Sequence, residues 1–174
     1  IDEILEKMTV CDPACGSGAF LVGMMTEIVR AQSALTRHFN AVRERTRYVL
    51  KRDAILRCLY GVDIDPGAVE IARLRLWLSL VVDEERTERI EPLPNLDYKI
   101  VHGNSLVGVE KDKHQVLWQE DILREIEELK KKEFDATNSE TKLKYRDKIA
   151  ELIHSILAGD EIFDFNIYFS EVFR

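Results

Sequence analysis

The sequence predicts an α/β fold, in which a partial parallel sheet carries helices on both faces and is followed by a charged helical hairpin. Short apolar runs at residues 8–11, 59–62 and 98–101 predict the strands, because each run ends in a polar turn. Amphipathic segments follow the first two runs, which gives the order β-α-β-α-β. A rise in charge predicts the hairpin, since 18 of the residues in 117–157 are charged.

The first strand leads through a glycine-rich turn into a helix. Met8–Cys11 is apolar and is ended by Asp12-Pro13. Strand, turn and helix form the first half of a βαβ unit. Residues 1–7 have the pattern of a helix end, so we expect the chain to be a piece of a longer polypeptide. The predicted apolar stripe of the helix after the turn consists of Leu21, Met24, Met25 and Ile28.

The second strand lies between two predicted helices. A basic helix is expected over about residues 40–57, before the strand Leu59–Val62. The arginines of this basic helix could contact DNA phosphates, although a solvated helix face is the commoner case. Pro66 fits the first turn of the next helix, which is expected to run to Val82. The residues expected to face the core from that helix are Ile71, Leu74 and Leu78.

The composition is that of a globular chain and argues against several classes of protein. Hydrophobic residues make up 45% and charged residues 33%, and the formal charge is −7. No apolar run reaches the roughly 18 residues that span a bilayer, so we expect no membrane partner and a cytoplasmic protein. Three cysteines without a Cys-x-x-Cys spacing argue against a disulfide framework and against a metal site.

The most informative segment is the glycine loop, residues 12–21, which reads Asp-Pro-Ala-Cys-Gly-Ser-Gly-Ala-Phe-Leu. Gly16 and Gly18 let the backbone turn tightly and approach a ligand closely. A phosphate-binding loop needs a lysine, which is missing, and a dinucleotide fingerprint needs a small residue where Leu21 stands. S-adenosylmethionine carries no phosphate, and Asp12 could take its amino group directly or through water. A merely tight strand–helix turn is the remaining alternative.

Four blocks of the sequence resemble adenine-specific N6 DNA methyltransferases and, within that group, type IIG restriction–modification enzymes. The resemblance covers residues 1–108, and the aromatic stretch 163–173 resembles the segment before the family's catalytic loop. It implies a Rossmann-like S-adenosylmethionine-dependent methyltransferase fold, the cofactor S-adenosyl-L-methionine, and double-stranded DNA bound through other parts of the parent protein. The blocks are residues 12–21, Leu59-Tyr60-Gly61-Val62-Asp63-Ile64-Asp65-Pro66, Ile71-Ala72-Arg73-Leu74-Arg75-Leu76-Trp77-Leu78 and Gly103-Asn104-Ser105-Leu106.

The resemblance also implies a set of cofactor-binding residues. Asp63 would accept hydrogen bonds from the ribose hydroxyls, while Asp65 is expected to cap the helix that follows. Ile64 would cover one face of the adenine, with core packing as its alternative, and Asn104 would meet the adenine edge unless it only forms a turn. Cys15 is expected to contribute backbone groups only. The whole predicted set is Asp12, Pro13, Ala14, Cys15, Gly16, Gly18, Phe20, Asp63, Ile64, Asn104 and Ser105.

The sequence contains no Asn/Asp-Pro-Pro-Tyr/Phe tetrapeptide, with which the family holds the flipped adenine. We therefore expect no catalytic residue in this chain and no activity from it alone. The predicted division is a cofactor-binding region, 1–110, a charged hairpin, 111–160, and a segment leading towards the missing catalytic loop, 161–174. The alternatives are a methyltransferase-like scaffold module and a methyltransferase that acts on protein or RNA.

Overall fold

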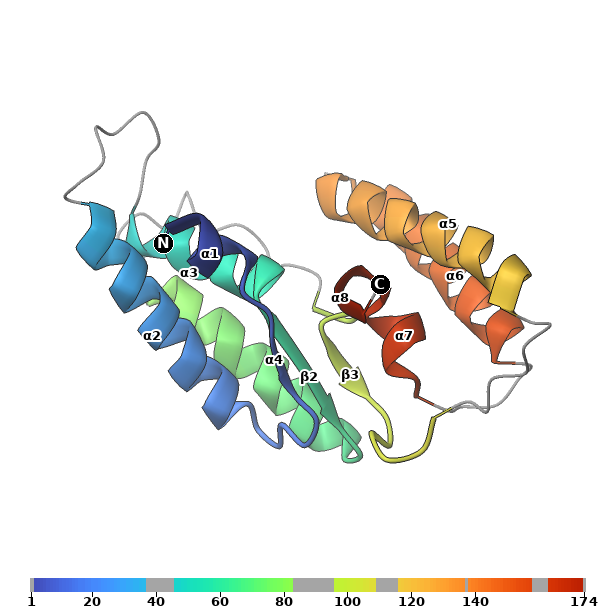
Figure 1. Ribbon diagram of the computed structural model, residues 1–174, viewed down its shortest axis with the longest axis horizontal. Coiled ribbons are helices and arrows are strands. Elements are labelled where there is room, and N and C mark those ends of the chain that lie inside the picture. The colour runs from blue at the N-terminus through green and yellow to red at the C-terminus, as the bar shows by residue number, and fades with distance from the viewer. Residues whose placement is uncertain are drawn as a thin grey trace. The chain divides into compact units, whose positions relative to one another are not determined.

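The chain divides into two compact units, Ile1–His102 and Gly103–Arg174, each described by itself (Figure 1). In this computed structural model the described residues are 2–36, 46–82, 96–108, 116–136, 138–157 and 163–173. Arg43 and Arg45, two of the arginines that could contact DNA, fall outside these ranges, as does the expected start of the basic helix.

The first unit contains the predicted parallel sheet, whose strand order is β1-β2-β3. β1 pairs with β2 from Val10 opposite Leu59, and β2 pairs with β3 as far as Asp63 opposite His102. Each strand therefore points its carboxyl end to the same edge of the sheet. The elements are α1 (Asp2–Lys7), β1 (Val10–Asp12), α2 (Ala19–Thr36), α3 (Arg47–Arg57), β2 (Leu59–Asp63), α4 (Pro66–Val81) and β3 (Ile100–His102).

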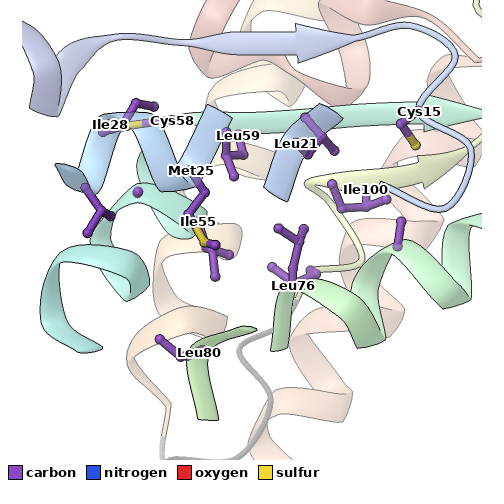
Figure 2. Close-up of a cluster of buried hydrophobic side chains, with 14 of the residues drawn as sticks. Cys15, Leu21, Met25, Ile28, Ile55, Cys58, Leu59, Leu76, Leu80 and Ile100 are labelled. Carbon is purple, nitrogen blue, oxygen red and sulfur yellow. The ribbon is translucent and has the colours of Figure 1, made fainter. Parts of the chain in front are cut away.

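One hydrophobic core holds this unit together. Leu59 and Ile100 face it from the sheet, and Figure 2 shows them against side chains of α2, α3 and α4. The predicted stripe of α2 is confirmed, since Leu21, Met25 and Ile28 are buried there and Met24 is partly buried against the same core. In the described part of this unit α2, α3 and α4 share that core and cover one face of the sheet. The sequence predicted helices on both faces, and this layer is one of the two.

The predicted core face of α4 is wrong. Ile71, Leu74 and Leu78 are 52%, 51% and 47% exposed. The helix has apolar residues on two opposite faces, so hydrophobic spacing alone could not select the inward one. Close packing of small Ala72 against the glycine loop selects the other face. The buried residues of α4 are Val69, Ala72, Leu76 and Leu80.

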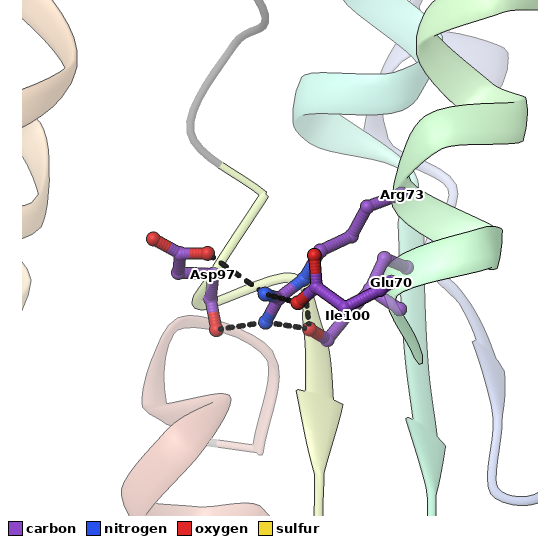
Figure 3. A network of polar contacts seen from close by, with 4 residues as sticks. All are labelled: Glu70, Arg73, Asp97 and Ile100. Carbon is purple, nitrogen blue, oxygen red and sulfur yellow. Dashed lines mark hydrogen bonds and ion pairs between the residues drawn. The ribbon is translucent and has the colours of Figure 1, made fainter. Parts of the chain in front are cut away.

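Arg73 of α4 covers the outer side of β3, which is the edge strand of the described sheet (Figure 3). A strand bonds to its neighbour through alternate residues, so the Ile100 carbonyl, next to the Lys99 carbonyl that bonds β2, points outward. Arg73 donates to Ile100 O from Nε at 3.0 Å and from Nη2 at 2.6 Å. Its Nη1 lies 2.8 Å from Glu70 and 2.9 Å from Asp97. The guanidinium thus satisfies a backbone acceptor at the sheet edge.

The second unit contains the predicted hairpin, with fully buried Ile126 and Ile149 in its core. Asn138, between the two helices of the hairpin, caps the second helix. The aromatic stretch forms two short helices that the sequence did not predict, and Asp164 caps the first of them. Lys130 joins the hairpin to this stretch by donating to Tyr168 O at 2.6 Å. The described helices are α5 (Val116–Asp135), α6 (Ser139–Ile156), α7 (Phe165–Tyr168) and α8 (Ser170–Phe173).

Replacing Arg73 with methionine should lower the free energy of unfolding by about 1–3 kcal/mol, because it leaves a backbone carbonyl without its charged donor. Arg30→Met is the matched control, since among the described residues Arg30 forms an exposed ion pair with Glu27, and there we expect a change below about 0.5 kcal/mol. Urea denaturation of the three chains measures both values. Equal losses from the two substitutions would show that Arg73 does not stabilise the sheet edge.

Candidate functional site

Polar side chains stand at the carboxyl end of every strand in the sheet. β1 ends at Asp12, β2 at Asp63 and β3 at His102. Open α/β folds bind their ligands at this edge, because the loops that follow the strands converge there. The described part of the first unit therefore has its candidate site at the ends of these strands.

The glycine loop, which follows β1, is held by its own turn and by β2. Asp12 Oδ1 accepts from the N–H of Ala14 at 3.2 Å and closes a local turn. The N–H of Cys15 donates to the Val62 carbonyl at 2.9 Å, so the loop continues the pairing between β1 and β2. Pro13 and Ala14 are exposed at the tip. The backbone path of the loop is therefore fixed before α2 begins.

Asp63 connects the glycine loop to the end of β2. Its Oδ2 accepts from the N–H of Gly16 at 2.7 Å, across 47 residues of sequence, and its Oδ1 accepts from the N–H of Asp65 at 2.9 Å. An ionised carboxylate has about four acceptor positions, so two further donors can bind while both backbone bonds remain. Sequence reasoning placed Asp63 at a ligand but did not foresee this bond to the loop.

The two glycines of the loop have different roles. Both adopt the left-handed region, with φ of 51° at Gly16 and 77° at Gly18. A Cβ on Gly16 would meet no described atom within 4 Å, whereas a Cβ on Gly18 would lie 2.9 Å from the Cβ of Ala72. Gly18 therefore has a packing role against α4, and its predicted approach to a ligand stays a prediction. Open space lies over Gly16.

A third glycine, Gly61 in β2, was missed as a site residue. A Cβ there would lie 2.9 Å from Leu21 Cδ1 and 3.1 Å from Cys15 Sγ. Glycine in a buried strand often marks such a close approach, and this was the available signal. In a dinucleotide fingerprint the helix supplies the small residue, whereas here the strand supplies it and the large Leu21 fills the gap.

The side chain of Cys15, a residue of the glycine loop, is buried and carries a neutral thiol. Burial raises its pKa to about 11, and the negative charges of Asp63 and Asp12 contribute in the same direction. Near pH 7 the side chain is therefore protonated, and a thiol of this kind is a poor nucleophile. The expectation that Cys15 offers only its backbone groups agrees with this environment.

The turn after β2 presents an apolar side chain and a confirmed helix cap. Ile64 is 67% exposed, so core packing does not explain it. Asp65 caps α4 by accepting from the N–H of Gly67 at 2.8 Å, as predicted. His102, the last residue of β3, lies with Nε2 3.0 Å from the Ile64 carbonyl.

Two more residues flank the loop where α2 begins. Phe20 is 54% exposed in the first turn of α2. Ser17 accepts from Nη1 of Arg75 at 3.0 Å, a contact from α4 that sequence reasoning missed. The exposed Phe20 ring therefore borders a loop that is held by Asp63 and by Arg75.

Asn104 and Ser105 belong to the second unit. The side-chain Oδ1 of Asn104 accepts from the N–H of Leu106 at 3.0 Å, which is the turn that was its alternative role. Gly103 packs against Phe163 so closely that a Cβ at position 103 would overlap the Cβ of that residue. The segment after β3 is thus shaped by the aromatic stretch.

The site offers two carboxylates that can accept from hydroxyl or ammonium donors. Among the described residues, no three His, Cys, Asp or Glu side chains gather as metal ligands would. No helix in the same ranges is long and apolar enough to cross a membrane.

Alanine at the glycines should separate loop strain from packing. Gly16→Ala should cost about 1–2 kcal/mol of unfolding free energy, the penalty of a left-handed residue. Gly18→Ala should cost about 1–3 kcal/mol more, because its methyl group would overlap α4. Gly23→Ala in α2 meets nothing described within 4 Å and should stabilise by about 0.5–1 kcal/mol. Urea denaturation tests the order, and a Gly18→Ala chain as stable as Gly16→Ala would contradict the packing role.

Comparisons with known proteins agree with the resemblance read from the sequence. A putative type II restriction enzyme and methyltransferase, RM.MjaORFECS2P of Methanocaldococcus jannaschii, is 45% identical over 111 residues, which are 62% of this chain and 9% of the relative. The type II restriction enzyme and methyltransferase RM.Eco57I of Escherichia coli is 31% identical over 132 residues, 69% of this chain and 13% of the relative. The adenine-specific methyltransferase PglX of Streptomyces coelicolor is 39% identical over 74 residues, 42% of this chain and 6% of the relative.

The chain thus spans only about a tenth of the length of the first two relatives. No solved structure matches it. The model of the family described as MmeI, DNA-methyltransferase domain, matches residues 1–134, which is more than half of the chain. These matches confirm the predicted resemblance to methyltransferases of restriction–modification systems, and the chain belongs to the MmeI DNA-methyltransferase domain family.

Proposed function

We propose that this chain is the S-adenosylmethionine-binding part of a site-specific DNA methyltransferase that methylates adenine at N6 in a restriction–modification system. Family membership supports a DNA methyltransferase, and the name of PglX supports adenine as the base. The observation that carries the proposal is the bond from Gly16 N–H to Asp63, which joins the glycine loop to an acidic residue at the carboxyl edge of the sheet.

The residues at this edge fit an unphosphorylated nucleoside cofactor. Asp63 keeps acceptor positions for two ribose hydroxyls, and Asp12 offers a carboxylate to a cationic amino group. Open space over Gly16 leaves room for the ligand to approach the backbone. Two carboxylates would repel a pyrophosphate, and the loop has no lysine to offset them. When bound, S-adenosylmethionine would supply a methyl group activated by its positively charged sulfur.

Other residues would orient the cofactor without taking part in the transfer. Ile64 and Phe20, both exposed, would cover the adenine and exclude water from it. Asn104 and Ser105 would meet the adenine edge. The backbone of Pro13, Ala14, Cys15 and Gly16 would line the methionine side, while Gly18 would act through its packing against α4.

The DNA substrate and the transfer step would belong to other parts of the enzyme. Activation of the adenine amino group needs acceptors for its hydrogens and an aromatic ring against the flipped base. The tetrapeptide that carries these groups in the family is missing from this sequence. We therefore propose that this chain binds the cofactor and that the whole protein, acting on double-stranded DNA in the cytoplasm, completes the reaction.

Asparagine at Asp63 and at Asp65 should affect cofactor binding differently. Asp63→Asn removes the charge that ribose hydroxyls would bind, at roughly 1.5–3 kcal/mol per charge-assisted bond, so affinity for S-adenosylhomocysteine should fall at least about tenfold. Some stability should be lost too, because the amide cannot accept from both backbone N–H groups. Asp65→Asn is the matched control, since asparagine caps helices as well as aspartate does.

The measurement is an NMR titration of the 15N-labelled chain, which detects weak binding and identifies the amides that respond. S-adenosylhomocysteine should shift the Gly16 and Asp65 amides, and ATP should not. We expect binding by the isolated chain to be weak, so the ligand is taken to millimolar concentration. Equal responses to both ligands, or none to either, would refute cofactor binding and favour a scaffold module.

A further inference from the structure

We propose that His102 is a positioning residue of the nucleoside subsite, because it holds the peptide that orients the Asp63 carboxylate. The inference deepens the proposed function and rests on it. It begins from the sheet register, which places His102 directly opposite Asp63 as the last residues of β3 and β2.

The direction of the hydrogen bond made by His102 is fixed by its partner. Nε2 lies 3.0 Å from the carbonyl oxygen of Ile64, and a carbonyl oxygen can only accept. Nε2 must therefore carry the hydrogen, either in the neutral tautomer with a bare Nδ1 or in the doubly protonated ring. His102 thus acts as a donor to the turn after β2.

The Ile64 carbonyl and the Asp65 N–H belong to one planar peptide group. His102 holds the carbonyl end of this plane, and Asp63 Oδ1 accepts from its N–H end at 2.9 Å. Rotation of the plane would break both bonds together. Fixing the carbonyl therefore also fixes the N–H that orients the carboxylate.

The second oxygen of the same carboxylate extends the connection to the glycine loop. Asp63 Oδ2 accepts from the Gly16 N–H at 2.7 Å. A chain of hydrogen bonds therefore runs from the end of β3, through the peptide after Ile64 and the Asp63 side chain, to the loop after β1. His102 begins this chain and would not need to touch the ligand.

Because Ile64 is exposed, the turn after β2 depends more strongly on the hydrogen bond from His102 to the Ile64 carbonyl. The Ile64 side chain is 67% exposed, so packing does not hold the turn in place from that side. A ligand that uses Asp63 for its ribose and Ile64 for its adenine depends on the position of this turn. Loss of the donor should leave the fold intact and weaken the nucleoside contacts.

The test compares His102→Leu, which removes the donor, with His102→Gln, whose amide N–H can reach the same carbonyl. His154→Leu, at an exposed histidine in α6, is the control. In the chain without ligand, amide hydrogen exchange at Asp65 and Gly16 should accelerate in His102→Leu and stay near the unsubstituted rate in His102→Gln and His154→Leu.

Affinity for S-adenosylhomocysteine, measured by NMR titration, should fall about three- to tenfold in His102→Leu, which corresponds to one ordinary hydrogen bond. It should recover to within about twofold in His102→Gln, with thermal midpoints nearly unchanged in all variants. Unchanged amide exchange in His102→Leu, or equal losses in the leucine and glutamine variants, would overturn the positioning role alone. Failure of the unsubstituted chain to respond to the ligand would overturn the proposed function and, with it, the nucleoside role of His102.

Discussion

The candidate site depends on one carboxylate. Asp63 accepts from Gly16 N–H with one oxygen and from Asp65 N–H with the other, and so joins the loop after β1 to the turn after β2. Both bonds are charge-assisted, the stronger class of hydrogen bond in proteins. They shape the backbone around a place where two further donors can still bind. The same side chain is thus a structural support of the loop and the proposed ribose acceptor.

Close packing beneath the loop gives that carboxylate a fixed partner. Gly18 lies against Ala72 of α4, and Gly61 of β2 leaves room for Leu21 and Cys15. These contacts belong to the core that α2, α3 and α4 build against the sheet (Figure 2). Because packed side chains of the core and the Asp63 carboxylate both hold the glycine loop in place, a ligand would meet a preformed surface. Less ordering would then be needed on binding, which favours affinity.

The sequence predicted the order of strands and helices, the hairpin and the cap at Asp65, since each depends on a local pattern. Features set by tertiary contacts were predicted less well. Apolar residues on both sides of α4 made its core face ambiguous, and the contact of Ala72 with Gly18 decided it. The sequence shows a glycine at position 18 but not whether that glycine approaches a ligand or a helix. The partner of His102 is a backbone carbonyl, which no sequence pattern reveals. The contact of Asn104 with a cofactor stays a prediction.

A crystal structure of the protein with S-adenosylhomocysteine would test the central claim most directly. The account predicts that both ribose hydroxyls lie within hydrogen-bond distance of Asp63 while the Gly16 N–H keeps its bond to Oδ2. The ligand should pass over Gly16, where no described atom lies within 4 Å of a Cβ position, and should leave the contact of Gly18 with Ala72 in place. A ribose bound away from Asp63, or a Gly16 N–H released from it, would contradict the shared carboxylate on which the account depends.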